Sequence, residues 1–165
     1  MILYHGSCCI VDRPRIIVPS RTLDYGSGFY TTRSEKQAYD WALKKISPSN
    51  PTNYVNVYEF DESQLSGLKV LWFDKPSSEW VDFVMRNRQD DGFQHDYDVV
   101  YGPVANDRVY VQFSLYEQGF LSKEGLLTEL KVYDLIDQML FHTDKAVRLL
   151  RFVRAREVKS GNMKE

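Results

Sequence analysis

The sequence predicts one α+β domain built around a largely antiparallel sheet. Strand-like and helix-like segments are mixed without strict alternation, which argues against a doubly wound parallel sheet. The 165 residues suffice for one hydrophobic core, and no stretch rich in Pro, Gly or Ser divides them. Hydrophobic residues make up 43% of the chain, which is too many for a disordered protein. We therefore expect a single domain over residues 1–158 and a flexible tail at 159–165.

The first part of the chain predicts a strand, a connector, a second strand and a helix. MILYHGS, residues 1–7, is a strand that ends at a glycine turn, and RIIVP, residues 15–19, is an extended connector. FYTT, residues 29–32, is aromatic and β-branched, as a second strand would be. Ser34 opens a helix that ends before Pro48. The apolar positions of this helix are Ala38, Trp41, Ala42 and Ile46.

The middle of the chain predicts two strands, a helix and another strand. YVNVYEF, residues 54–60, and LKVLWF, residues 68–73, show the alternation and β-branching of a half-buried sheet. Residues 77–88 predict a serine-capped helix, and residues 97–103 a strand that stops at Gly-Pro. The apolar face of the helix comprises Trp80, Phe83 and Val84.

The last part predicts two helices, a strand and a final helix. Residues 107–117 alternate in part like a strand, but a helix is favoured because their apolar residues share one helical face. Residues 122–133 predict a further helix, and DQMLFHT, residues 137–143, a short strand. Thr143 caps a last amphipathic helix. Its apolar positions are Ala146, Val147, Leu150 and Val153.

Composition argues against membrane and secretory classes. No window approaches the roughly 18 apolar residues that a membrane helix needs. The N-terminal apolar run is interrupted, unlike that of a signal peptide. The interrupting residues are His5, Asp12, Arg13 and Arg15. We therefore expect a cytoplasmic protein with no membrane partner.

The net charge is −2 and the pI is near 5.9, so the protein has no overall positive field that would attract nucleic acid. Two local clusters of arginines still allow the interpretation of a locally basic groove. The first comprises Arg13, Arg15 and Arg21, and the second Arg148, Arg151, Arg154 and Arg156. The second cluster is expected to be a solvated helix face.

The two cysteines, Cys8 and Cys9, are adjacent, which is poor geometry for a structural disulfide. We expect reduced thiols that pack in the first strand. Neither has the ligand spacing of a zinc site, so no metal is predicted.

Two glycine-containing stretches predict a pocket near the N-terminus. LYHGS, residues 3–7, places His5 at the end of a strand. DYGSGFYTT, residues 24–32, has glycines at 26 and 28 that let the backbone approach a ligand closely. The two consecutive aromatic residues behind these glycines offer a flat ring beside such a ligand.

These stretches resemble the motifs of the ADP-ribosyltransferase superfamily, in its histidine-tyrosine-glutamate branch. Members have a first-strand histidine followed by glycine and a small hydroxyl residue, then a Gly-x-Gly-hydrophobic-Tyr segment, and a glutamate at the start of a late strand. The whole chain is also similar to a short bacterial family of unknown function in that superfamily, through GFYTT...A..WA, DVVYGPVANDRVY and DQMLFHT...A..LL. The resemblance implies an ADP-ribosyltransferase-like split antiparallel sheet with flanking helices.

The resemblance also implies NAD as the substrate. The backbone of Gly6, with Ser7 beside it, would grip the nicotinamide, Tyr30 would stack on the ring, and His5 would bond a ribose hydroxyl. The implied cofactor-binding set is His5, Gly6, Ser7, Tyr25, Gly28, Phe29 and Tyr30. For Phe29 core packing is favoured, because adjacent strand residues face opposite sides. The implied chemistry is loss of nicotinamide through an oxocarbenium-like state.

The implied catalytic residues are His5, Tyr30 and Gln138, and Gln138 stands where the branch has glutamate. An amide can bond a ribose hydroxyl, but it cannot set a negative charge against the developing cation. Loss of one such preorganised contact typically costs about a hundredfold or more in rate. Asp137 is expected on the opposite face of the strand. Three glutamates are expected to be solvated on helices: Glu117, Glu124 and Glu129.

Four further polar residues are given roles outside the catalytic site. His142 shares a strand face with Gln138 by parity, and a structural or capping role is favoured over a catalytic one. His95 lies in a predicted turn and is expected at the surface. Asn106 and Asp107 are expected to cap the following helix.

Three functions follow from the resemblance. The first is an NAD-dependent mono-ADP-ribosyltransferase that modifies a protein or nucleic acid, as a bacterial toxin or defence effector with an inhibitor or antitoxin partner. The second is an inactive module that binds NAD or an ADP-ribosyl group. The third is an NAD glycohydrolase that transfers to water alone.

Overall fold

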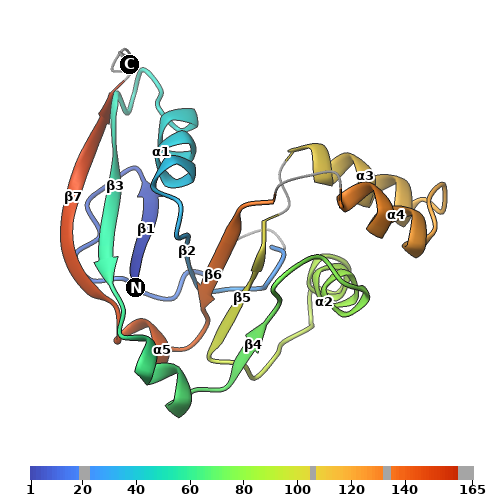
Figure 1. The fold of residues 1–165 in the computed structure, drawn as a ribbon. Coiled ribbons are helices and arrows are strands. Elements are labelled where there is room, and N and C mark those ends of the chain that lie inside the picture. The colour runs from blue at the N-terminus through green and yellow to red at the C-terminus, as the bar shows by residue number, and fades with distance from the viewer. Residues whose placement is uncertain (19–22, 105–106, 132–134, 160–165) are drawn as a thin grey trace.

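The chain forms two β-sheets with helices packed against them (Figure 1). The computed structural model describes residues 1–18, 23–104, 107–131 and 135–159. In chain order the elements are β1 (Ile2–Ser7), β2 (Phe29–Thr31), α1 (Glu35–Lys44), β3 (Thr52–Glu59), the 3-10 helix η1 (Glu62–Gly67), β4 (Val70–Trp72), α2 (Ser78–Gln89), β5 (Val99–Pro103), α3 (Asp107–Glu117), α4 (Lys123–Leu130), β6 (Asp137–Phe141), α5 (Asp144–Val147) and β7 (Arg151–Lys159). The predicted α+β class is confirmed.

The two sheets differ in size, and within the described residues one β-bridge joins them. One sheet has the order β1-β3-β7, and the other has the order β2-β6-β5-β4. Every described strand pair is antiparallel except β4 with β5. Between the sheets, Tyr4 and Thr32 exchange two backbone hydrogen bonds, with N···O distances of 2.8 and 2.9 Å. β1 and β2 therefore touch at this bridge, which fixes how LYHGS lies against the end of FYTT.

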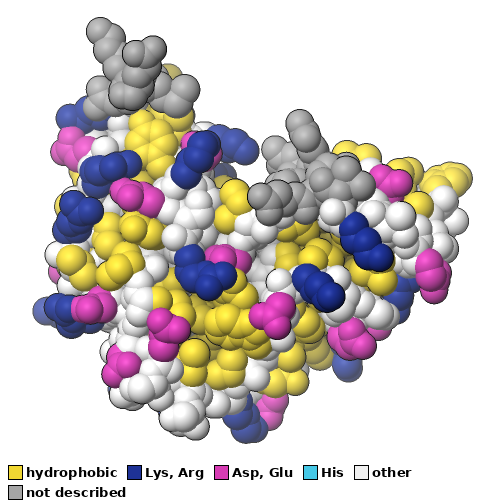
Figure 2. Space-filling model, in the orientation of Figure 1, with side chains coloured by type: hydrophobic (Ala, Val, Ile, Leu, Met, Phe, Trp, Pro, Cys, Tyr) yellow, Lys and Arg dark blue, Asp and Glu magenta, His cyan; other side chains and the backbone are white. Residues whose placement is uncertain are grey.

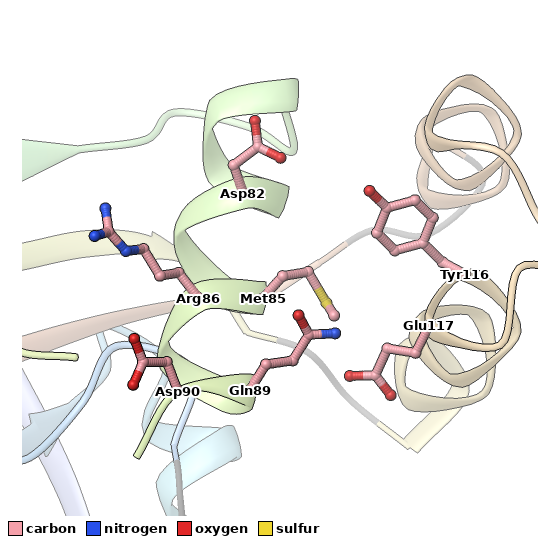
Figure 3. Close-up of a pocket in the computed structure, with 7 residues that line it drawn as sticks. All are labelled: Asp82, Met85, Arg86, Gln89, Asp90, Tyr116 and Glu117. Atoms are coloured by element: carbon pink, nitrogen blue, oxygen red, sulfur yellow. The ribbon is translucent and has the colours of Figure 1, made fainter. Parts of the chain in front are cut away.

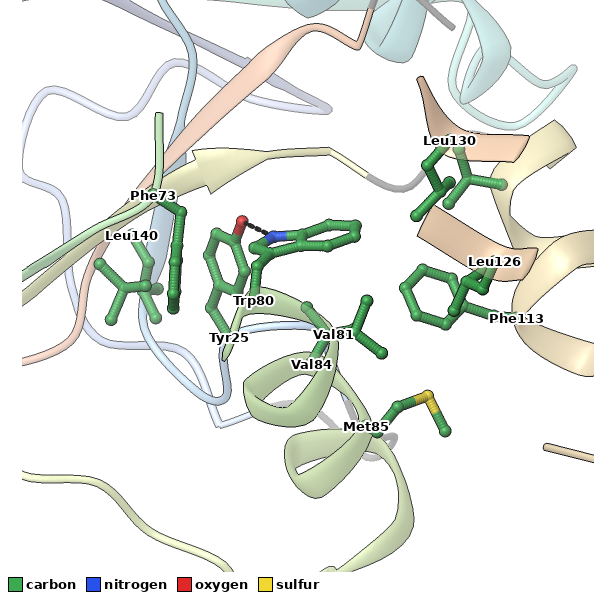
Figure 4. Close-up of a cluster of buried hydrophobic side chains, with 12 residues drawn as sticks. Tyr25, Phe73, Trp80, Val81, Val84, Met85, Phe113, Leu126, Leu130 and Leu140 are labelled. Atoms are coloured by element: carbon green, nitrogen blue, oxygen red, sulfur yellow. Dashed lines mark hydrogen bonds between the residues drawn. The ribbon is translucent and has the colours of Figure 1, made fainter. Parts of the chain in front are cut away.

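The largest core cluster lies between the β2-β6-β5-β4 sheet and helices α2, α3 and α4 (Figure 4). Trp80 of α2 is fully buried there, and its indole N–H donates to the hydroxyl of Tyr25 at 2.7 Å. That hydroxyl donates in turn to the carbonyl of Pro103 at 2.8 Å. The pair therefore fixes α2, the end of β5 and the segment before β2 relative to one another.

Two further clusters hold the other sheet in place. One fills the space between the two sheets and includes Phe29, Tyr58 and Phe141. The other lies under α1 and comprises Ala38, Ala42, Val55 and Val158. The small residues of α1 let this helix lie close to β1 and β3.

The predicted helix starts are confirmed where the sequence offered a hydroxyl cap. Each capping side chain accepts a hydrogen bond from a backbone N–H of the first helical turn. The caps are Ser34 for α1, Ser77 for α2, Ser122 for α4 and Thr143 for α5. Asn106 lies outside the described residues, as does the tail from 160 to 165.

The predicted last helix is wrong beyond its first turn. α5 ends at Val147, and residues 151–159 form β7, which pairs with β3 along its length. Val158 packs under α1, and the ring of Phe152 meets that of Tyr58 at 5.9 Å. Pairing with β3 and burial of these side chains outweigh the helical spacing, as tertiary context often does. The arginines of this segment lie on an edge strand and not on a helix face.

Three smaller predictions also need correction. Cys8 and Cys9 are exposed thiols after the end of β1, so they do not pack in the strand. The strand predicted at 68–73 is shorter, because η1 precedes it and only β4 is regular. Trp41 is 48% exposed on α1, where the ammonium group of Lys45 lies 4.9 Å from its ring.

Lys and Arg side chains are interspersed with Asp and Glu over the face shown in Figure 2, around a central hydrophobic area. No helix within the described ranges combines the length and apolarity needed to cross a bilayer.

Candidate functional site

His5 lies in β1 just after the bridge to β2, at the point where backbone pairing between these two strands ends. It follows the bridge residue Tyr4, and its Nδ1 lies 2.7 Å from the carbonyl oxygen of Tyr30. In the register of the bridge, Tyr30 is the residue that would face Gly6 across the two strands. The imidazole therefore bonds a β2 carbonyl at the point where backbone pairing would otherwise continue.

Hydrogen bonding and burial define the protonation state of His5. A carbonyl oxygen only accepts, so the ring proton is on Nδ1. Burial lowers the pKa of His5, and the bond to Tyr30 opposes this effect. The ring is therefore neutral at neutral pH, and its Nε2 is an acceptor suited to a hydroxyl group.

Gly6 has two structural roles. Tyr4 directs its N–H and C=O to β2, so Gly6, two residues later on the same strand, directs its own to the same side. A Cβ at Gly6 would lie 2.2 Å from the carbonyl oxygen of Ala38 in α1. Close packing of α1 therefore requires glycine here, while the peptide presents a donor and an acceptor toward β2.

Ser7 closes the turn that follows β1. Its Oγ donates to the carbonyl of Cys9 and accepts from the amide of Asn56, at 3.2 Å in the second case. Asn56 is fully buried and also donates to the Cys9 carbonyl. The hydroxyl of Ser7 is thus engaged within the chain.

Tyr30 turns its hydroxyl back onto the loop before β2. The hydroxyl donates to the carbonyl of Gly26 at 2.6 Å and accepts from the N–H of Tyr25 at 3.2 Å. Burial raises the pKa of Tyr30 far above that of a free phenol, so the group stays protonated. Stacking of this ring on a ligand remains a prediction.

Two other predicted pocket residues are enclosed in the core. Tyr25 is 0% exposed and Phe29 is 1% exposed. Burial raises the pKa of Tyr25 as well, against the hydrogen bond from Trp80. Gly28 has φ +145°, and a Cβ there would lie 2.5 Å from the carbonyl of Phe141, so close packing on β6 requires this glycine. Core packing of Phe29, the favoured role, is confirmed.

Gln138 lies in β6 opposite Gly102 of β5, on the face that packs toward Tyr25. Leu140, two residues later, pairs with Tyr30, so the side chains of Tyr30 and Gln138 share one face of the sheet. The Nε2 of Gln138 is buried and makes no hydrogen bond within the described part of the chain, although its side chain lies close enough to the hydroxyl of Tyr25 to lower the pKa of that group. A buried amide donor without a partner is unusual and needs a physical explanation.

Asp137 lies on the other face, as expected. Its carboxylate accepts from Arg33 and from the hydroxyl of Tyr101. The ring of Trp72 stacks on that of Tyr101, with centroids 3.8 Å apart.

The three candidate catalytic residues all lie at β2, but not on one face of its sheet. The His5 ring lies on one face, and the side chains of Tyr30 and Gln138 lie on the other. His5 contacts the backbone of Tyr30, and its ring lies 4.4 Å from that of Phe29, whose side chain faces the opposite way from that of Tyr30. The side chain of Gln138 shares the face of the Tyr30 ring.

The prediction of a surface position for His95 is wrong. Its Nε2 lies 2.8 Å from the carbonyl of Tyr25, and its ring lies 4.1 Å from that of His142. The Nδ1 of His142 lies 2.6 Å from the carbonyl of Ser27, which agrees with the structural role favoured for this residue. No spacing in the sequence connects positions 95 and 142, so only the fold reveals this pair.

A family model described as "Protein of unknown function (DUF3990)" matches residues 1–152. The chain belongs to the DUF3990 family. The matched region includes His5, Tyr30 and Gln138 and ends inside β7. No curated protein matches the chain.

The DUF3990 chain also has an open cavity of about 560 Å³ between α2 and the end of α3, away from the predicted motifs (Figure 3). Its lining residues are Asp82, Met85, Arg86, Gln89, Asp90, Tyr116 and Glu117. Of its carboxylates, Asp82 pairs with Lys123 at 2.5 Å and Glu117 lies 3.8 Å from Arg88. Among the described residues, no group of three or more His, Cys, Asp or Glu side chains is arranged to hold a metal ion.

Proposed function

We propose that this protein binds NAD and transfers its ADP-ribose to a macromolecular acceptor. The observation that carries the proposal is the bond between His5 and the carbonyl of Tyr30, which unites the two motifs of the resemblance. In the reaction, the bond between nicotinamide and the ribose carbon breaks and nicotinamide leaves with the bonding electrons. A nucleophile of the acceptor bonds that carbon and releases its proton to solvent.

Three features of the site support NAD as the ligand. The neutral ring of His5 offers Nε2 to a ribose hydroxyl. The peptide groups of Gly6 face β2 and offer the donor and acceptor that a carboxamide needs. The buried Nε2 of Gln138 supplies a further donor on the Tyr30 face of the sheet, opposite the face on which the His5 ring lies.

The neutral side chain of Gln138 also supports a second candidate, a module that binds NAD or an ADP-ribosyl group without reaction. A glutamine gives no charge to stabilise an oxocarbenium-like state, which removes an electrostatic contribution of about a hundredfold or more. The two candidates share the ligand and differ in chemistry.

Calorimetry with NAD and transfer of label from NAD to protein or nucleic acid in a cell lysate test both candidates. Transfer of label supports the transferase, and binding without nicotinamide release supports the module. Nicotinamide release without acceptor indicates a glycohydrolase. Absence of NAD binding by the folded protein refutes all three.

Gln138→Glu is the sharpest variant, with Gln64→Glu on the exposed η1 as its control for added charge. If Gln138→Glu creates activity in an inert protein, the wild type is a binding module. If the wild type is active and Gln138→Glu lowers its rate, glutamine is part of the working site.

A further inference from the structure

Three successive backbone carbonyls before β2 are each bonded by a side chain. His95 bonds the carbonyl of Tyr25, Tyr30 that of Gly26, and His142 that of Ser27, at 2.8, 2.6 and 2.6 Å. We call residues 25–27 the carbonyl loop. Its position therefore depends on one tyrosine and two histidines.

The two histidines reach the carbonyl loop from different elements, and their rings are in contact in a tilted arrangement. His95 comes from the segment between α2 and β5, and His142 directly follows β6. Their ring centroids are 4.1 Å apart, with an interplanar angle of 37°. Gly26, at φ +85°, lies under this pair: a Cβ there would be 3.6 Å from Nε2 of His95. The two rings thus enclose the loop from one side.

The hydrogen bonds assign one tautomer to each neutral ring. Because carbonyls only accept, His95 carries its proton on Nε2 and His142 on Nδ1. The Nδ1 of His95 is then a buried acceptor, and it has no partner among the described residues. Protonation of His95 would place a charged N–H at this position.

The surroundings of the pair disfavour a doubly charged state. The rings of Phe83, Phe93 and Tyr97 surround His95, and the carboxylate of Asp96 is the acidic group that acts on it. Burial lowers the pKa of His95, and the neighbouring His142 lowers it further.

On the His142 side, Asp98 bonds the backbone of His142, and Asp144 follows two residues later in the chain. Asp98 accepts through its carbonyl from the N–H of His142, while its carboxylate bonds Thr143 and lies 3.7 Å from Lys145. Asp144 opens α5 in its first turn. Beyond the carbonyl loop, Asp24 lies 3.8 Å from Arg88.

We propose that His95 and His142 are positioning residues for Tyr30, and that the pair forms a proton-sensitive clamp on the carbonyl loop. While at most one ring is charged, the ring contact and both carbonyl bonds persist. When both rings are charged, like charges 4.1 Å apart separate the rings and displace the loop that holds the hydroxyl of Tyr30. The effect on NAD rests on the proposed function, whereas the clamp itself does not.

The clamp is tested by NMR, because the chain has only three histidines and their ring signals can be assigned individually. On acidification from pH 8, we expect the ring of His95 to gain its proton at a pH below the ordinary range of an imidazole, because burial lowers its pKa. The amide signals of Gly26 and Gly28 should shift with that step. If these two amides do not move with the histidines, the clamp is refuted.

Two isosteric substitutions separate charge from hydrogen bonding. Gln places a donor where Nε2 of His95 lies, and Asn places one where Nδ1 of His142 lies. In His95→Gln/His142→Asn the amides of Gly26 and Gly28 should become insensitive to pH. An unchanged pH response refutes the clamp. If the double variant does not fold, each single variant should abolish the pH-dependent shift of these two amides, and a surviving shift refutes the clamp equally.

NAD affinity provides the second readout. From pH 7.5 to 5.5 we expect the wild type to lose at least about tenfold in affinity and the double variant less than about threefold, a difference typical of a site coupled to one titration. An equal loss in both proteins refutes the link to Tyr30. If the amides respond as expected but no NAD binds at any pH, the proposed function fails and the clamp stands.

Discussion

Gly6→Ala tests the packing that places the first motif. A Cβ at this position would lie 2.2 Å from the carbonyl oxygen of Ala38 and 3.1 Å from the N–H nitrogen of Ala42. Real Cβ contacts essentially never fall under 3.0 Å, so α1 must move by at least 0.8 Å, the difference between 3.0 and 2.2 Å. Both clashing atoms are backbone, so no side chain can rotate away.

Overpacking of this kind costs about 1–3 kcal/mol, and a backbone clash lies at the upper end. For a domain of this size, about 2–3 kcal/mol lowers the Tm by about 5–10 °C. Thermal unfolding followed by circular dichroism measures this loss. The control is Gly67→Ala, since nothing lies within 4 Å of a Cβ at Gly67, and we expect a change within about 0.5 kcal/mol. Equal Tm values for the two variants would show that α1 does not pack on β1 as described.

Three further substitutions test the core, the site and a cap. Tyr25→Phe leaves the indole N–H of Trp80 buried without its acceptor and should cost about 1–3 kcal/mol in urea unfolding. The pKa of His5 is lowered in the folded state, so its contribution to stability is complete above about pH 6.5 and declines as the pH falls below that value. His5→Asn should therefore make the free energy of unfolding depend less steeply on pH between pH 7.5 and 5.5. Thr143→Ala removes the α5 cap and the bond to Asp98, so we expect a loss of about 1–2 kcal/mol in thermal unfolding, which Thr143→Ser should largely restore.

Local patterns predicted most of the fold because they act within a few residues. Hydroxyl caps at Ser34 and Ser77 defined the starts of α1 and α2, and the alternation in YVNVYEF defined β3. The error at β7 has a different origin. Its apolar residues fit a helix by spacing, and only pairing with β3, about a hundred residues away in the chain, makes the extended form more favourable.

The candidate site could be predicted only in part, for the same reason. The sequence pointed to His5 and Tyr30, and the fold places the ring of one against the backbone of the other. The roles of glycine were less visible, because Gly6 and Gly28 are both required by close packing within the chain. His95 and His142 were assigned separately, since their contact depends on how the segment before β5 meets the end of β6.

Glycines required for packing do not distinguish a binding site from a core, but polar groups without partners do. The buried Nε2 of Gln138 has no hydrogen-bond partner within the described ranges, so its retention costs stability unless a ligand, solvent or the nearby hydroxyl of Tyr25 satisfies it. Gln138→Met keeps the side-chain volume and removes the polar atoms. We expect it to raise the free energy of unfolding by about 1–2 kcal/mol while it weakens NAD binding. A loss of stability in urea unfolding would show that the amide has a structural partner, and it would remove Gln138 from the candidate site.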